Sequence, residues 1–112
     1  MKGSNQFTIK GKLGSDPKQH STADNQAMAF FSVAVSNDFI DRETHQWVEK
    51  DPTWLDVTAF SHVADKAIKL KKGDTVRVFG SLTQRKQSID TVNGSKDYGF
   101  IGLRANAIEE LR

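Results

Sequence analysis

Apolar and polar residues alternate along most of this chain, and an alternation with a period of two predicts β-strands that bury one face. In the first such stretch Phe7 and Ile9 share one face, while the residues around them are polar. Gly11 interrupts this stretch and indicates a bulge or bend where the sheet curls. The alternation predicts five strands, over residues 5–13, 27–36, 53–60, 74–86 and about 98–107.

The segments between the predicted strands differ in character. Residues 14–26 are polar and are expected to form a loop. Residues 37–52 are mostly polar and charged, which is compatible with a long hairpin arm that turns near Thr44. The dipeptide Asn93-Gly94 is a strong hairpin signal ahead of the last predicted strand.

One helix is predicted between the third and fourth strands. Ser61 is the candidate N-cap, and Lys71-Lys72-Gly73 would supply a cationic last turn and a C′ glycine. Apolar residues recur at helical spacing between these ends, at Val63, Ala64, Ala67, Ile68 and Leu70. Three strands, a helix and two strands predict an all-β protein with one short helix, in the order of an OB-fold. We therefore expect residues 1–112 to form one domain, a five-stranded Greek-key barrel with a helix between strands 3 and 4.

Composition narrows the functional classes. The chain has 112 residues and no apolar run long enough to span a bilayer, and its amino terminus shows no signal-peptide pattern, so we expect a cytoplasmic protein. The absence of cysteine excludes a disulfide framework, a thiolate metal site and a cysteine nucleophile. Sixteen basic against fourteen acidic residues give a formal charge of +2, which is compatible with a polyanionic partner without requiring one.

The third predicted strand, residues 53–60, carries the most informative pattern. Its apolar set suits the barrel interior and consists of Leu55, Val57 and Ala59. Its opposite face carries Trp54, Asp56, Thr58 and Phe60, so two large aromatic residues share a polar face. They are six residues apart, which is about 20 Å along a strand, and separated rings of this kind can stack on bases of an extended single strand. The pattern is equally compatible with both rings packing beneath the helix, the hairpin arm or a partner subunit.

Ordered blocks of the sequence resemble the bacterial single-stranded-DNA-binding proteins. They read IKGKLGSDP at 9–17, AFFSVAVS at 29–36, Trp54 with Val57, Ala59 and Phe60, LKKGD at 70–74 with Val76, Val78 and GSL at 80–82, and ANAIEEL at 105–111. The blocks occur in the family's order over nearly the whole chain, which makes them far more specific together than any one of them alone.

The resemblance implies an OB-fold that assembles as a homotetramer and wraps single-stranded DNA with little sequence preference during replication, recombination or repair. We expect no enzyme activity, cofactor, metal or membrane partner, and a place in the bacterial cytosol or nucleoid, for a chromosomal, phage or plasmid product. The positions that match the family's stacking aromatics are Trp54, Phe60 and, after a small insertion, Phe39. The positions that match its phosphate-binding bases are Lys71, Lys72, Arg85 and Lys86, with Arg42 on the arm as a looser match. For Lys71 and Lys72, placement at the end of a helix is an equally good explanation.

The sequence departs from the family at three places. Gln87 stands where many relatives have an aromatic residue, so one stacking plane is expected to be missing. Trp47 has no fixed counterpart; it could replace that plane or form a cross-strand pair within the arm. Family members usually continue into a flexible linker and an acidic tail, whereas this sequence stops at Arg112. Either a tail has been trimmed or this is a tailless form, and in a tailless form recruitment of replication or repair enzymes is not expected.

Three other classes of function compete with single-strand binding. A hydrolase or nuclease has little support, because His20, His45 and His62 fall on separate segments without metal-ligand spacing. A primosome-type OB protein, which binds single strands as a dimer and acts mainly through protein partners, is the main alternative. A barrel that has lost nucleic-acid binding and only docks proteins is the third. Two aromatic residues on one polar face favour the nucleic-acid binder.

Overall fold

The computed structural model describes residues 3–92 and 94–111, with the side chains of residues 85–91 and 95–100 excepted. The elements are β1 (Phe7–Leu13), β2 (Lys18–Ser21), β3 (Ala27–Val35), β4 (Phe39–Ile40), β5 (Trp47–Val48), β6 (Thr53–Phe60), α1 (Ser61–Ala67), β7 (Thr75–Thr91) and β8 (Gly94–Leu111).

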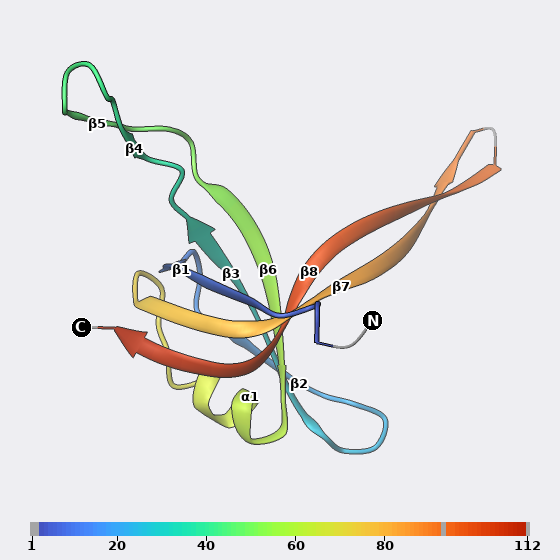
Figure 1. Ribbon diagram of the computed structural model, residues 1–112. Coiled ribbons are helices and arrows are strands. Elements are labelled where there is room, and N and C mark those ends of the chain that lie inside the picture. The colour runs from blue at the N-terminus through green and yellow to red at the C-terminus, as the bar shows by residue number, and fades with distance from the viewer. Residues whose placement is uncertain (1–2, 93, 112) are drawn as a thin grey trace.

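Five strands close into a barrel with the neighbour order β1-β7-β8-β6-β3, and β1 pairs again with β3 to complete it (Figure 1). The β6–β8 pair is parallel and the other four barrel pairs are antiparallel. The remaining strand of this sheet, β2, lies outside the closed barrel and extends it along the edge of β3. The predicted OB-fold is confirmed, including the position of the helix between its third and fourth barrel strands.

The barrel interior is filled by the residues that the alternation places on the inner faces. Its largest fully buried side chains are Leu103, Val33, Val57, Val76 and Val78. The short helix α1 packs against β3, β6 and β8 through its buried face, and Figure 1 shows it below the barrel. The interior is therefore built from β-branched and leucine side chains of moderate size, which is typical of a small closed barrel.

Glycine permits the close approach of strands where the barrel curls. Gly11 pairs with Val35 of β3 and with Val76 of β7, and a Cβ at this position would collide with the backbone oxygen of Ala34. The hydrogen-bond ladder shows no register shift at Gly11, so this glycine marks a place where strands approach closely and not a bulge. The register shift lies between Phe79 and Gly80 in the β7–β8 pair. Curvature enters the sheet at both places because no side chain keeps the backbones apart.

Two predictions about the connections are wrong in part. Residues 14–26 were expected to form a loop, but Lys18–Ser21 pairs with Ala27–Phe30 as strand β2. This strand has only exposed side chains, so it lacks the alternating pattern by which a half-buried strand is recognised. The β7–β8 hairpin is also longer than predicted, since the ladder continues out to the pair Thr91–Gly94. The expected turn residue Asn93 lies outside the described residues.

The helix is shorter than predicted and begins differently. Phe60 occupies the N-cap position with extended backbone angles, and no side chain caps the first turn. Ser61, the predicted N-cap, is instead the first helical residue, with a φ of 55°. Its hydroxyl accepts a hydrogen bond of 2.7 Å from the side-chain amide of Gln26. The helix stops at Ala67 because the following residues turn into a loop in which the Leu70 amide bonds the Ala67 carbonyl.

Lys71 and Lys72 therefore lie in a turn after the helix and not in its last turn. The Asp74 amide bonds the Lys71 carbonyl at 3.0 Å, and Gly73 has a φ of 92°, which explains the glycine at the third position of this turn. The Lys72 amide donates to the carboxylate of Asp16 at 2.7 Å, which ties the turn to the loop after β1. The helix-dipole explanation for these two lysines is thus removed.

Two hairpins project from the barrel in Figure 1, one formed by β4 and β5 and the other by the outer halves of β7 and β8. The first is the predicted arm: the His45 amide bonds the Asp41 carbonyl at 2.8 Å, and His45 has the left-handed φ of 57° expected in a tight turn. No helix in the described part of the chain is long and apolar enough to cross a membrane.

Candidate nucleic-acid interface

The outer face of the β3–β6 pair brings three aromatic residues, Phe30, Trp54 and Phe60, to one surface. Because the inward residues of these strands, such as Val33 and Val57, are fully buried, the residues between them point outward. Cross-strand pairs along this face are Ala34–Trp54, Ser32–Asp56, Phe30–Thr58 and Met28–Phe60. We call these eight residues the aromatic face. The prediction that Trp54 and Phe60 point to the same side of their strand is confirmed.

Trp54 stands at one end of the aromatic face with 60% of its surface exposed. Its indole ring lies directly over Gly14, so closely that a Cβ on Gly14 would overlap the edge of the ring. With this much of its surface exposed, the indole is not packed beneath α1 or the arm, which removes two of the three buried alternatives for this ring. The indole is therefore in contact with Gly14 on one side, while most of its surface is open to solvent.

Phe60 lies at the other end and is half-buried. The guanidinium carbon of Arg104 lies 4.6 Å from the centre of its ring, which is a cation–π contact. Arg104 reaches this position because β8 runs parallel to β6 and pairs Arg104 with Thr58. The contact places a permanent positive charge beside the second predicted stacking ring.

Strand β2 widens the aromatic face with Lys18 and His20, which were not predicted to bind nucleic acid. Lys18 pairs with Phe30 and His20 with Met28 across the β2–β3 ladder. The His20 and Phe30 rings meet edge to face, with centres 5.3 Å apart and an interplanar angle of 71°. Phe30 could have been found from its parity in the second predicted strand, whereas Lys18, His20 and Arg104 could not, because their positions depend on strand pairing.

The arm carries a second group of predicted residues. Phe39 pairs with Val48 and Ile40 with Trp47, so the predicted cross-strand pair exists, yet Trp47 remains 69% exposed. Lys50 places its ammonium 5.3 Å from the centre of the Phe39 ring. Arg42 lies in the turn of the arm and is exposed.

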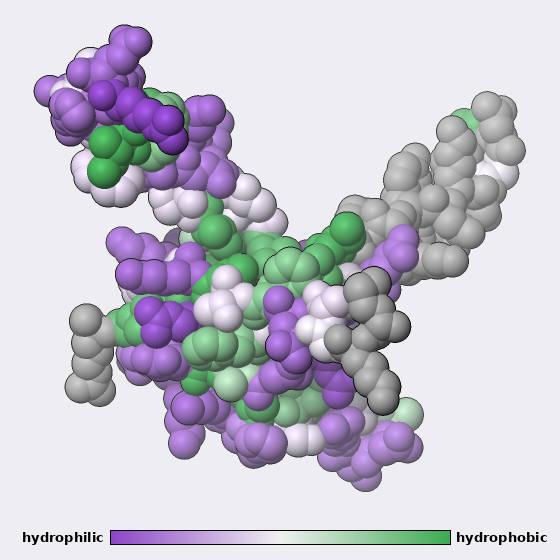
Figure 2. Space-filling model, viewed as in Figure 1, coloured by the Kyte–Doolittle hydropathy of each residue, from purple (hydrophilic) through white to green (hydrophobic). Residues whose placement is uncertain are grey.

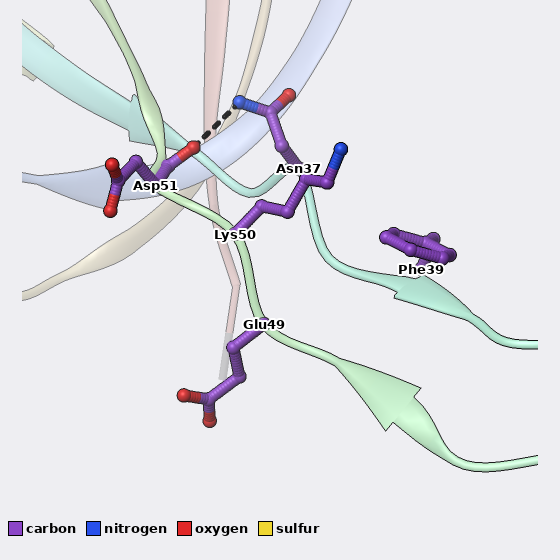
Figure 3. Close-up of a pocket in the computed structure, with 5 residues that line it drawn as sticks. All are labelled: Asn37, Phe39, Glu49, Lys50 and Asp51. Carbon is purple, nitrogen blue, oxygen red and sulfur yellow. Dashed lines mark hydrogen bonds between the residues drawn. The ribbon is translucent and has the colours of Figure 1, made fainter.

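An open cleft of about 910 Å³ lies where the arm joins the barrel (Figure 3). The Asn37 amide bridges its two sides by donating to the Asp51 carbonyl at 2.9 Å and to the Thr53 hydroxyl at 2.8 Å. Lys50 and Phe39 come from opposite sides and point into the same space, while Glu49 points away. These contacts hold the base of the arm but leave its tip without a partner among the described residues.

The predicted basic residues are not all brought to the aromatic face. Lys71 and Lys72 are exposed and lie beside the loop that leads into β2. Arg85 and Lys86 lie on β7 opposite Phe100 and Gly99, but their side chains are outside the described residues, as is that of Gln87. Among the residues whose side chains are described, Arg104 contacts a ring of the aromatic face, and Lys18 lines a pocket together with Phe30.

A family model with the description "Single-strand binding protein family" matches residues 4–99. The chain belongs to this family. The resemblance to the single-strand binding proteins that the sequence blocks indicated is thereby confirmed, and the match includes both ends of the aromatic face.

Curated relatives with the same kind of name are found among bacteria. The chain is 34% identical over 97 residues to the single-stranded DNA-binding protein of Mycobacterium tuberculosis strain H37Rv, covering 86% of this chain and 58% of the relative. It is 32% identical over 97 residues to that of Paenarthrobacter aurescens, covering 86% and 56%. It is 31% identical over 82 residues to single-stranded DNA-binding protein 2 of Tropheryma whipplei strain Twist, covering 72% and 55%. The matched part of the chain thus spans just over half the length of these three relatives.

Gly14 supplies a direct test of how the Trp54 ring is held. We expect Gly14→Ala to push the indole off its support, because the added methyl group needs the space of the ring edge. The tryptophan emission maximum should shift, and the affinity for a single-stranded oligonucleotide should fall by about threefold to tenfold, a part of one stacking contact. In a Trp54→Ala background the same substitution should leave the affinity unchanged, and an equal loss in both backgrounds would contradict the mechanism.

Proposed function

We propose that this chain binds single-stranded DNA with little sequence preference, by stacking bases on its aromatic face and holding phosphates with the surrounding cations. The observation that carries the proposal is the aromatic face itself: an indole that is 60% exposed at one end and a phenyl ring beneath a guanidinium at the other. The face lies on an OB barrel of the single-strand binding protein family, whose curated bacterial relatives are named for this activity.

The arrangement favours single strands over duplex DNA for a physical reason. Exposed rings can replace base–base stacking only for bases that are not already stacked and paired, and each such contact contributes about 1–3 kcal/mol with little regard to base identity. Along the face from Trp54 to Phe60 the distance of about 20 Å leaves room for several nucleotides of an extended strand. Phe30 and His20 lie between or beside these ends and are proposed as additional ring surfaces.

Cations on several elements are proposed to follow the phosphates. Arg104 contacts the Phe60 ring, and Lys18 lines a pocket together with Phe30. Lys71 and Lys72 extend the path past the β1–β2 loop, and Arg85, Lys86 and Arg42 remain proposed phosphate contacts on the two hairpins. Phe39 and Trp47 on the arm are proposed as outlying stacking residues, since both are exposed and Lys50 supplies a charge beside Phe39.

The chain is further proposed to act as a homotetramer on strands exposed during replication, recombination or repair in a bacterial cell. Exposed large apolar side chains on β1, β7 and β8 include Phe7, Phe79, Leu82 and Ile101. Figure 2 shows apolar residues gathered across the middle of the visible face, between the bases of the two hairpins. An apolar surface of this kind supports contact between copies of the chain, and the molar mass from light scattering distinguishes a tetramer from a dimer.

The proposed function is tested by titrating the protein with poly(dT) and with a duplex of matched length. We expect the tryptophan fluorescence to be quenched by the single strand and not by the duplex. The affinity should fall steeply as the salt concentration rises, because lysine and arginine side chains displace counterions from the phosphates when the strand binds. Replacing Arg104 by glutamine should reduce the slope of log affinity against log salt concentration by about one unit.

Arg77 provides the matched control for this test. It is also an arginine on a barrel strand, but its guanidinium pairs with Glu109 at 3.6 Å on a different pair of strands. Arg77→Gln should therefore leave the salt slope unchanged. Equal binding of single strand and duplex would overturn the proposed function, and equal slopes for the two variants would remove Arg104 from the interface.

A further inference from the structure

Asp56 is an acidic residue in the middle of the aromatic face. It lies on β6 between Trp54 and Phe60, and its side chain is exposed. A surface that only follows phosphates gains nothing from a carboxylate at its centre, because like charges repel one another. A carboxylate there can accept hydrogen bonds, and in a DNA strand the groups that donate them are found on the edges of the bases.

The carboxylate is held in place by its cross-strand partner. The hydroxyl of Ser32 donates to Oδ1 of Asp56 at 3.0 Å, and the two residues are directly opposite in the β3–β6 ladder. The hydrogen of the hydroxyl is used in this bond, so the pair presents oxygen lone pairs outward, from Ser32 Oγ and from Asp56 Oδ2. The centre of the face is therefore a fixed hydrogen-bond acceptor.

A small pocket surrounds this acceptor. It has a volume of about 260 Å³, and the residues that line it include Asp56, Ser32, Phe30, Lys18 and Ser15. Phe30 contributes an aromatic ring and Lys18 a positive charge at the same place, so one nucleotide would find there a stacking surface, a phosphate contact and a hydrogen-bond acceptor. These are the parts from which base-selective single-strand sites are built.

We propose that this pocket receives one base of the bound strand and that Asp56 accepts a hydrogen bond from an exocyclic amino group, which favours cytosine over thymine at that position. The proposal rests on the proposed function and refines it, since it superimposes a modest preference on otherwise sequence-tolerant binding. Asp56 is then a specificity-determining residue, and Ser32 is the positioning residue that orients its carboxylate.

Cytosine and thymine differ where the carboxylate would meet them. Cytosine presents its N4 amino group, and a carboxylate accepts readily from that donor. Thymine presents O4 instead, and its N3–H lies between two carbonyl oxygens that a carboxylate repels. The two rings are of the same size, so they stack about equally well, and the comparison isolates the hydrogen bond.

The test measures the affinities of labelled oligonucleotides of one length that contain only deoxycytidine, only thymidine or only deoxyuridine. The quantity compared is the ratio of the cytidine to the thymidine affinity, with deoxyuridine correcting for the thymine methyl group. Asp56→Asn should lower this ratio by about threefold to tenfold, because the neutral amide can both accept from cytosine and donate to thymine O4. Ser32→Ala should lower it in the same direction by a smaller factor, since the carboxylate loses the bond that orients it.

The matched control is Asp65→Asn, which removes the same charge from an exposed position on α1. It should change the affinity for all three oligonucleotides by one common factor and leave the ratio as it is. An unchanged ratio in Asp56→Asn, with binding retained, overturns this proposal and leaves the proposed function standing. Failure of the wild-type protein to bind any of the oligonucleotides overturns the proposed function as well.

Discussion

Replacing Trp54 and Phe60 together by alanine is expected to weaken the binding of poly(dT) by about 2–6 kcal/mol, the sum of two stacking contacts. The physical reason is that both ends of the aromatic face lose the flat surface on which an unpaired base lies. Arg104 also loses the ring against which its guanidinium is held. The measurement is fluorescence anisotropy of a labelled oligonucleotide, because the variant lacks one of the two tryptophans that would otherwise report binding.

The variant should remain folded, since Trp54 is largely exposed and Phe60 is half-buried. Thermal unfolding followed by circular dichroism checks this. Ile68→Ala is a suitable control, because it removes an exposed apolar side chain just after α1 and away from the aromatic face. A double variant that melts like the wild type and binds poly(dT) with unchanged affinity would refute the stacking role of both rings.

Leu103→Ala is expected to lower the free energy of unfolding by about 2–5 kcal/mol. Leu103 is among the largest fully buried side chains of the barrel, and it lies on β8 where this strand pairs with both β6 and β7. Its removal leaves a cavity at the point where the barrel closes, and closely packed neighbours can fill that space only in part. Urea unfolding measures the loss.

Leu82 is a close control for this substitution, because it is also a leucine and pairs directly with Leu103 across the β7–β8 ladder. The two side chains are on the same side of the sheet, but Leu82 is 36% exposed where Leu103 is 1% exposed. Leu82→Ala should therefore cost well under half as much stability, since less apolar surface and no enclosed cavity are involved. Equal losses for the two variants would mean that the barrel does not close around Leu103 as described.

Much of the fold was predictable because the alternation of apolar and polar residues is visible within a single segment of the chain. The alternation over 27–36 and 53–60 corresponds to β3 and β6 within one residue, and it separates buried Val33 and Val57 from their outward neighbours. An exposed strand has no such signal, which is why Lys18–Ser21 was expected to be loop. The helix start was misplaced for a related reason: a serine at a strand–helix junction suits an N-cap, but here the Ser61 hydroxyl is bonded to Gln26, far away in the sequence.

Part of the candidate site was likewise predictable from a single strand, and the rest depended on how the strands pair. Parity along one strand sufficed to bring Trp54 and Phe60 to one face, because side chains of a strand alternate whatever its neighbours are. Strand pairing then decided what surrounds them: Arg104 reaches Phe60 only through the parallel β6–β8 pair, and Lys18 reaches Phe30 only through the β2–β3 ladder. The Ser32–Asp56 bond likewise depends on a register between strands more than twenty residues apart.

By itself, then, the amino-acid sequence determined the order of the barrel elements, the inward and outward side of each main strand, and membership of a family through ordered blocks of residues. Only the tertiary structure decided which cations adjoin the rings, that Gly14 supports the Trp54 indole, and that a carboxylate is held at the centre of the face. The physical reason is that alternation is a property of a single backbone segment. The register of one strand against another, by contrast, is set by the closing of the whole barrel.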